Sequence, residues 1–160
     1  MPLLRAALCV AALALAGCGF QLRGTAELSP RMAAPYLEVP DRYTPFNAAL
    51  ESALRASGAT LARSREGSSA VVRVRRDEAG RKVLSVTAQN TPAEYEVFYT
   101  VEYSVVADGT ELLPPQSLTL TREYTYDETQ VLAKQHEERA IREALARDLA
   151  GLVMRRLAVL

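Results

Sequence analysis

The sequence has no surplus of charge of either sign: its 160 residues include 19 Lys and Arg residues and 19 Asp and Glu residues. Proteins that bind nucleic acid gather Lys and Arg on one face, because neutralising phosphates releases counterions and drives binding. The balance of charge therefore excludes a general polyanion binder, and we expect no nucleic-acid partner. A chain of this length is expected to form one domain.

Cysteine and histidine are scarce. The chain contains two cysteines, Cys9 and Cys18, and a single histidine, His136. These residues provide no nucleophile with a neighbouring base and no His/Cys cluster for zinc, and residues 136–140 lack the second His of a metalloprotease helix. We expect no enzyme and no cofactor. A hydrolase with two catalytic carboxylates stays open, because any fold can bring two acids together.

Long apolar runs are absent except at the start of the chain. Of the first 17 residues 14 are apolar, and the run from Ala6 to Ala16 follows one basic residue, Arg5. A membrane-spanning helix needs about 20 apolar residues, so residues 1–17 are predicted to be a secretory signal peptide. Cys9 leaves with that peptide, and Cys18 alone cannot form an internal disulfide.

The residues Leu-Ala-Gly-Cys at 15–18 resemble the lipobox of bacterial lipoproteins. The resemblance implies cleavage before Cys18 and covalent attachment of a diacylglyceryl group and an N-acyl chain to it. Burial of each methylene contributes about 0.8 kcal/mol, so three chains anchor a protein firmly in a membrane. Gly19 stands where lipoproteins of the inner membrane commonly carry Asp, which implies sorting to the outer membrane. The alternative is a signal peptide followed by an incidental cysteine.

Prolines punctuate the next segment, at positions 30, 35, 40 and 45. Because they exclude a continuous helix or a central strand, residues 18–34 are predicted to be the lipidated Cys and a tether, and residues 35–160 a single domain. Residues 35–40 leave room for one short strand at a sheet edge. Thr44 is a candidate N-cap in front of Pro45, and apolar residues at helical spacing predict a helix that closes at Gly58.

A period of two begins near Ser69 and predicts strands. Residues 69–75 and 82–88 flank Asp77–Gly80, which predicts a hairpin whose tip is basic. Guanidinium and ammonium groups there could bind lipid phosphates or carboxylates, although charged hairpins also serve simply to protect a sheet edge. The basic residues of this predicted hairpin are Arg73, Arg75, Arg76, Arg81 and Lys82.

Two later strands have one apolar and one polar face. They are predicted over Glu94–Val106 and Leu118–Tyr126, with Asp108–Gly109 as a turn. Asp127 and Gln130 then form a capping box, and apolar residues from Leu132 onward predict a helix of about 28 residues, or about 42 Å. Such a helix exceeds the span of a small sheet, so one end is expected to overhang or to contact a partner.

These elements predict an α+β fold in which two α-helices pack on one face of a mixed, mostly antiparallel sheet of four or slightly more strands. The polar outer face of this sheet does not require another helix or sheet to pack against it. It is equally compatible with bulk solvent and with the hydrated lumen of an outer-membrane barrel.

Three short motifs resemble the LptE family of lipopolysaccharide-assembly lipoproteins: Cys-Gly-Phe-Gln-Leu-Arg at 18–23, Ala-Glu-Tyr at 93–95 and Leu-Ala-Lys at 132–134. The resemblance implies two helices on a four-stranded sheet and a non-enzymatic role. It implies that the protein plugs and helps assemble an LptD-like outer-membrane β-barrel and binds lipopolysaccharide during its insertion into the outer leaflet.

The resemblance also implies basic lipid-binding residues near the first hairpin and at the start of the last helix. Lys134 matches the helix position, whereas the arginine of the family's hairpin falls at or near Ala88 and is not reproduced. On charge alone, Arg81 and Lys82 are the substitutes for it. Two other functions stay open: a stand-alone lipid-carrying chaperone, which requires an enclosed apolar cavity, and a lipid-tethered periplasmic hydrolase, which requires acids clustered in a cleft.

Overall fold

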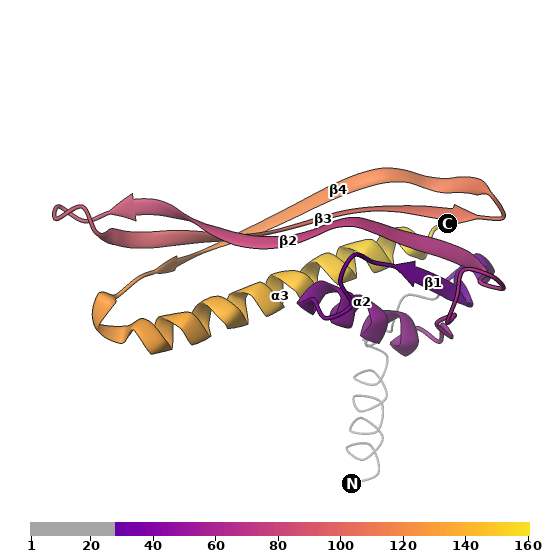
Figure 1. Cartoon of the computed structure of the whole chain (residues 1–160), viewed down its shortest axis with the longest axis horizontal. Coiled ribbons are helices and arrows are strands. Elements are labelled where there is room, and N and C mark those ends of the chain that lie inside the picture. Colours follow the sequence, from indigo (N-terminus) through magenta and orange to yellow (C-terminus); the bar gives the residue numbers. More distant parts are fainter. Residues whose placement is uncertain (1–27) are drawn as a thin grey trace, which may run out of the picture.

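The computed structural model describes residues 28–160, so the predicted signal peptide and Cys18 lie outside the described residues. The strands are β1 (Pro35–Glu38), β2 (Ala70–Val86), β3 (Pro92–Ala107) and β4 (Thr110–Thr125), and the helices are η1 (Pro30–Met32), α2 (Pro45–Ala56), η2 (Glu128–Gln130) and α3 (Val131–Leu157). The sheet has the order β1-β2-β3-β4, with β1 parallel to β2 and the other pairs antiparallel. Both α-helices lie on one side of it (Figure 1), and the predicted α+β fold is confirmed.

Local sequence signals set the starts of both helices. In α2, the Thr44 hydroxyl accepts a hydrogen bond from the Asn47 amide at 3.1 Å, and Pro45 occupies the first turn, where no amide proton is needed. Before α3, the Asp127 carboxylate accepts hydrogen bonds from the Thr129 amide and the Gln130 side chain, both at 2.9 Å. Asp127 therefore caps the helix start as predicted, but the start is the 3-10 helix η2, and the Gln130 side chain bonds the Asp127 carboxylate and not its amide, so the reciprocal capping box does not form.

The core lies between the sheet and the helices. Its largest fully buried side chains come from β2, β3, both helices and η1: Tyr99, Tyr103, Phe46, Met32, Leu50, Leu54, Leu145, Leu149, Leu157, Val72, Val97 and Val101. The apolar faces predicted for α2 and for the Glu94–Val106 strand are thus the buried ones. Met32 belongs to this core, so the packed domain already includes the last residues of the segment predicted to be a tether.

The hairpin predicted at Asp77–Gly80 is wrong. β2 runs without a turn from Ala70 to Val86 and pairs with β3 along this length. A register shift between Val74 and Arg76 moves the inward positions from even to odd numbers, which disturbs the alternation without reversing the chain. The reversal lies at residues 87–91, where the Thr87 amide donates to the Thr91 carbonyl at 2.8 Å and Asn90 has φ 61°.

The predicted turn at Asp108–Gly109 is present between β3 and β4. Both residues have positive φ, 50° and 74°, as the two-residue turns that suit twisted hairpins require. The strands it joins are long, 16 residues each. As a result the β2–β3–β4 sheet extends far beyond β1 and α2 (Figure 1).

The prediction that the last helix overhangs the sheet is wrong, because the sheet is longer than expected. The 27 residues of α3 span about 40 Å, whereas strands of 16 or 17 residues span more than about 50 Å, and the β2–β3 end of the sheet reaches past the start of α3 (Figure 1). Residues 131–137 of α3 still form no part of the buried core, and Leu132, the first residue of the predicted apolar face, is 73% exposed. Burial begins at Glu138 and Ile141.

Gly80 lies opposite Phe98 on the outer face, where a Cβ added to it would come within 2.4 Å of the Phe98 ring. We expect Gly80→Ala to lower the free energy of unfolding by about 1 kcal/mol, because the ring must move. In a Phe98→Ala background the same change should raise it by about 0.5 kcal/mol, since Gly disfavours strands. Urea unfolding of the wild type, the two single variants and the double variant measures these changes. A change of the same sign in both backgrounds would contradict the contact between residue 80 and the Phe98 ring.

Candidate functional site

Arg81, a predicted lipid-binding residue, lies within β2 and faces α3. Its Nη1 is 2.5 Å from Glu138 Oε2 and donates to the Tyr124 hydroxyl at 3.3 Å. Its guanidinium carbon stands 4.4 Å from the centre of the Tyr95 ring, which is a cation–π distance. The expectation that Arg81 is at a hairpin tip is wrong: it ties β2 to β4 and α3.

Glu138 is the centre of this cluster. It is 9% exposed, accepts from the Tyr124 hydroxyl at 3.0 Å and forms ion pairs with both Arg81 and Arg142. Burial acts to raise the pKa of Glu138, but the Tyr124 hydrogen bond and the two guanidinium groups outweigh it and hold the pKa below its usual range. The hydrogen bond to Tyr124 raises the pKa of Arg81. The cluster therefore contains a carboxylate and two guanidinium groups, all charged at neutral pH.

Lys82 points to the opposite face of the sheet from Arg81, because successive side chains of a strand alternate. Its Nζ is 2.7 Å from Glu96 Oε1 on the neighbouring strand. The structure thus separates the two residues predicted to share a site. Ala88, the position without the family's arginine, lies in the turn between β2 and β3.

Lys134 lies in the first turn of α3, one turn before Glu138. Its Nζ pairs with Glu137 Oε2 at 2.9 Å, and its side chain is 19% exposed. Residues i and i+4 of a helix occupy the same face, so Lys134 and the Arg81–Glu138 cluster lie on the same side of the sheet. The structure therefore brings Arg81 and Lys134 together and leaves Lys82 apart.

Two arginines of this site were not predicted. Arg139 and Arg142 line an open hollow of about 250 Å³ on α3 together with Gln135 and Glu138. The sequence offered one signal, the Glu138/Arg142 pair at i,i+4, but that pair indicates only a stable helix. We call Arg81, Lys134, Arg139 and Arg142 the basic cluster. Three of its cations form ion pairs with two carboxylates: Arg81 and Arg142 with Glu138, and Lys134 with Glu137.

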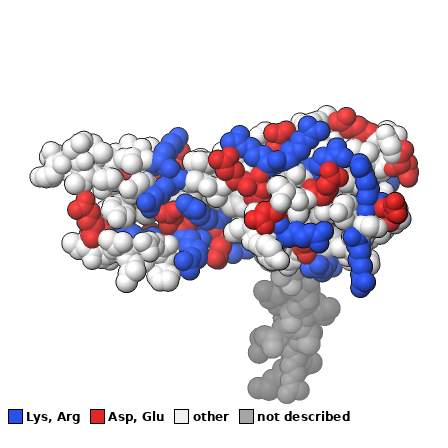
Figure 2. Space-filling view, in the orientation of Figure 1, with Lys and Arg blue, Asp and Glu red and all other residues white. Residues whose placement is uncertain are grey.

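Exposed apolar side chains occupy the end of the molecule next to the basic cluster. Val83 and Val86 of β2 are 49% and 53% exposed, and Leu132 of α3 is still more open. Figure 2 shows this end as largely uncharged, with Lys and Arg side chains behind it toward the middle of the molecule. Apolar surface beside a surplus of positive charge suits an amphiphilic anion.

The outer face of the sheet is polar over β3 and β4. Cross-strand pairs include Thr100 with Thr119, whose hydroxyls are 2.9 Å apart, and Glu102 with Ser117. No helix of the described structure covers this face (Figure 1). Such a surface is suited to contact with water or with a hydrated wall.

Residues 28–160 contain no group of three or more His, Cys, Asp or Glu residues placed to hold a metal ion. Within the same residues, no helix combines the length and the apolar character needed to cross a membrane.

Known proteins resemble this chain along most of its length. It is 27% identical over 151 residues to the LPS-assembly lipoprotein LptE of Yersinia enterocolitica, covering 94% of this chain and 72% of the relative. It is 28% identical over 150 residues to that of Pectobacterium atrosepticum, covering 92% and 80%.

Solved structures agree with the fold. The rare lipoprotein B of Shewanella oneidensis superposes with a TM-score of 0.69 at 25% identity, covering 79% of this chain and 94% of the other. The uncharacterized lipoprotein B of Nitrosomonas europaea has a TM-score of 0.73 at 24% identity, covering 88% and 90%. The family model LptE, described as lipopolysaccharide-assembly, matches residues 34–157, which include every strand and both α-helices. The chain belongs to the LptE family of lipopolysaccharide-assembly lipoproteins.

Proposed function

We propose that this protein is a lipoprotein of the outer membrane, acylated at Cys18, that occupies an LptD-like β-barrel and binds lipopolysaccharide through the basic cluster. One observation supports the lipid-binding part most strongly. At the end of the molecule formed by β2, β3 and α3, exposed apolar side chains adjoin the four cations of the basic cluster, of which Arg139 has no carboxylate within ion-pair distance among residues 28–160.

The chemistry of lipopolysaccharide suits this end. Its phosphates accept charge-assisted hydrogen bonds from guanidinium and ammonium groups, and its acyl chains gain free energy on contact with apolar side chains. Arg139 has no carboxylate within ion-pair distance among residues 28–160, and Lys134 pairs with a Glu137 whose side chain is 45% exposed. Arg139, which is exposed, is therefore the cation most readily available to a ligand. The side chain of Lys134 is only 19% exposed, and that of Arg81, 41% exposed, is held by Glu138.

A place inside a barrel suits the shape and the outer face of the sheet. The barrel lumen of an outer-membrane protein is polar and hydrated, and the Thr- and Glu-rich outer face of β3 and β4 is polar without being strongly charged. The long sheet, with α3 running alongside it, gives the protein an elongated form (Figure 1). The alternative, a stand-alone carrier, needs an enclosed apolar cavity, whereas the space between helices and sheet is filled by fully buried side chains such as Leu145, Leu149 and Val101.

Co-purification tests the proposal. A tagged full-length protein is expressed in its own host, membranes are solubilised in mild detergent, and the protein is recovered. We expect a large outer-membrane barrel protein to accompany it in equal amount, and the mass of the recovered chain to match residues 18–160 with three acyl chains. Recovery without a barrel would contradict the plug, and an unmodified Cys18 would contradict the anchor.

A further inference from the structure

A second basic site lies at the other end of the molecule, away from the basic cluster. An open hollow of about 320 Å³ is formed by β1, the segment after it, α2 and residues 61–63. Leu37, which is 8% exposed, and Leu61 give it an apolar floor. Residues 60–62 are held beside β1 by two backbone bonds, Thr60 N to Ala33 O at 2.8 Å and Ala62 N to Pro35 O at 2.9 Å.

Its rim carries three guanidinium groups, those of Arg42, Arg55 and Arg63, and one carboxylate, that of Glu51. Glu51 is already occupied: Oε2 is 2.8 Å from Arg55 Nη2, and Oε1 accepts from the Asn47 side chain at 3.2 Å. Among the described residues no carboxylate lies within 4.0 Å of the other two guanidinium groups. The hollow therefore presents two unneutralised guanidinium groups above an apolar floor.

This arrangement suits a phosphate joined to a small organic group. Guanidinium binds phosphate through two parallel hydrogen bonds, and it is less strongly hydrated than ammonium. The hollow falls at the low end of the roughly 300–1,000 Å³ of small-molecule sites, which is enough for a glycerol phosphate but not for a whole lipid.

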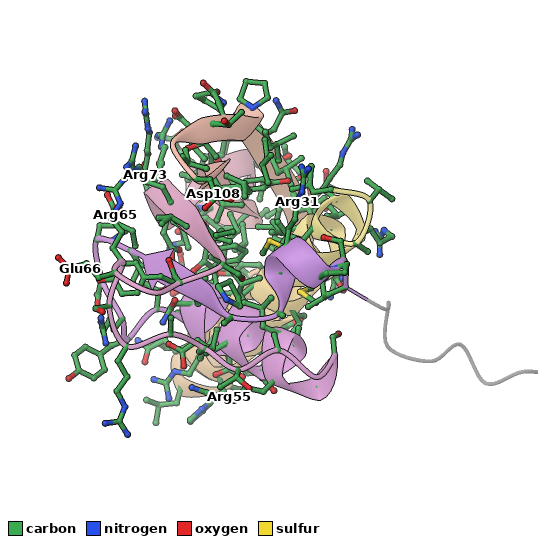
Figure 3. All side chains as sticks on the ribbon, turned by 90° about the vertical axis from the view of Figure 1, so that its right-hand side faces the viewer. Arg31, Arg55, Arg65, Glu66, Arg73 and Asp108 are labelled. Atoms are coloured by element: carbon green, nitrogen blue, oxygen red, sulfur yellow. The ribbon has the colours of Figure 1, made fainter. Side chains whose placement is uncertain are left out.

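The hollow also lies at the end of the molecule where the described chain begins. β1 begins where the predicted tether ends, and the described chain starts at the same end of the molecule (Figure 1). Figure 3 looks at this end and shows Arg31, Arg55, Arg65 and Arg73 around it, with Glu66 and Asp108 among them. The nine residues between Cys18 and Leu28 allow the two Cα atoms to lie at most about 35 Å apart when extended, so an acylated Cys18 would keep this end near the membrane.

We propose that the hollow between β1 and α2 binds the glycerol phosphate headgroup of an anionic phospholipid in the leaflet that holds the anchor. The proposal rests on the proposed acylation of Cys18. Contact at the hollow would hold this end against the membrane surface and point the basic cluster away from it, which acyl chains attached only at Cys18 would not achieve.

Vesicle flotation tests this with residues 18–160 carrying Cys18→Ser, so that no acyl chain contributes. The vesicles are phosphatidylcholine with or without phosphatidylglycerol. The variant Arg42→Gln/Arg63→Gln is compared with Arg155→Gln/Arg156→Gln, which removes the same charge from exposed arginines of α3. We expect affinity for phosphatidylglycerol vesicles to fall about tenfold or more in the first variant and less than about twofold in the second.

Titration with soluble glycerol 3-phosphate identifies the source of the phosphate. Binding of vesicles that depends on Arg42 and Arg63 supports the lipid headgroup. Binding of the soluble ester alone, with the same dependence, would overturn the membrane contact while keeping the phosphate site. Equal losses in the two variants, or no preference for phosphatidylglycerol, would overturn the site itself. None of these outcomes affects the barrel co-purification or the mass of the acylated chain, so the two proposals fail separately.

Discussion

Replacing Glu138 by Ala is expected to lower the free energy of unfolding by about 2 kcal/mol. The change leaves Arg81 and Arg142 without their shared carboxylate and the Tyr124 hydroxyl without its acceptor. The loss stays below that of a fully buried ion pair, because both guanidinium side chains are more than a third exposed and water replaces part of the interaction. Urea unfolding at neutral pH measures the effect.

The effect should depend on pH in a defined direction. The pKa of Glu138 in the folded protein is depressed, so its carboxylate stabilises the fold above the unfolded pKa, which is about 4.3. That stabilisation is lost as the pH falls through the folded pKa. The difference in stability between the wild type and Glu138→Gln should therefore be full at neutral pH and shrink progressively below about pH 4.

Glu143→Gln is the matched control. Glu143 also pairs with an arginine at i+4, Arg147, but at 4.0 Å and with its side chain 50% exposed. We expect its replacement to change the stability by less than about 0.5 kcal/mol. Equal effects of the Glu138 and Glu143 variants, or a Glu138→Gln effect independent of pH, would contradict the role of Glu138 as the centre of the cluster.

Removing Lys134 and Arg139 together is expected to weaken lipopolysaccharide binding about a hundredfold. Each residue would contribute a charge-assisted hydrogen bond to a phosphate, and the loss of one such bond typically costs about tenfold or more in affinity. Neither residue belongs to the buried core, so the double variant Lys134→Ala/Arg139→Ala should keep its unfolding midpoint and its barrel. A direct binding assay with purified lipopolysaccharide measures the dissociation constant.

Lys82→Ala provides the control, since Lys82 carries the same charge but points to the outer face, where it pairs with Glu96. We expect it to change lipopolysaccharide affinity less than about twofold. Binding that survives in the double variant, or that Lys82→Ala weakens as strongly, would place the lipid site elsewhere on the protein.

Local patterns in the sequence were sufficient for most of the fold. The Thr44-Pro45 pair, the cap by Asp127 and the Asp108–Gly109 turn act through neighbouring residues, and each is present where the sequence predicts it. The alternation from Tyr95 to Val105 predicted the buried face of β3 correctly. These features can be predicted from the sequence because the interacting groups lie within a few residues of each other.

The prediction of a hairpin at Asp77–Gly80 was wrong because the interactions that decide this segment are not local. Its turn-like residues are kept extended by contacts that are distant in the sequence. The Tyr99 hydroxyl donates to Asp77 at 2.7 Å, Thr44 donates to the same carboxylate at 2.5 Å, and the Phe98 ring covers Gly80. The β2–β3 pairing thus overrides a local preference for a turn.

By itself, the sequence determined the elements, the polar and apolar faces of the sheet and the lack of any bulk attraction to anions. It also supplied Lys134 as a candidate, through a short motif. The tertiary structure decided which cations share a site: the bulge after Val74 places Arg81 on the helix side of the sheet and Lys82 on the outer side, and Glu138 of α3 brings Arg81 together with Arg142. The physical reason is that one extra residue in a strand reverses the facing of every side chain after it, and no local pattern reports that reversal.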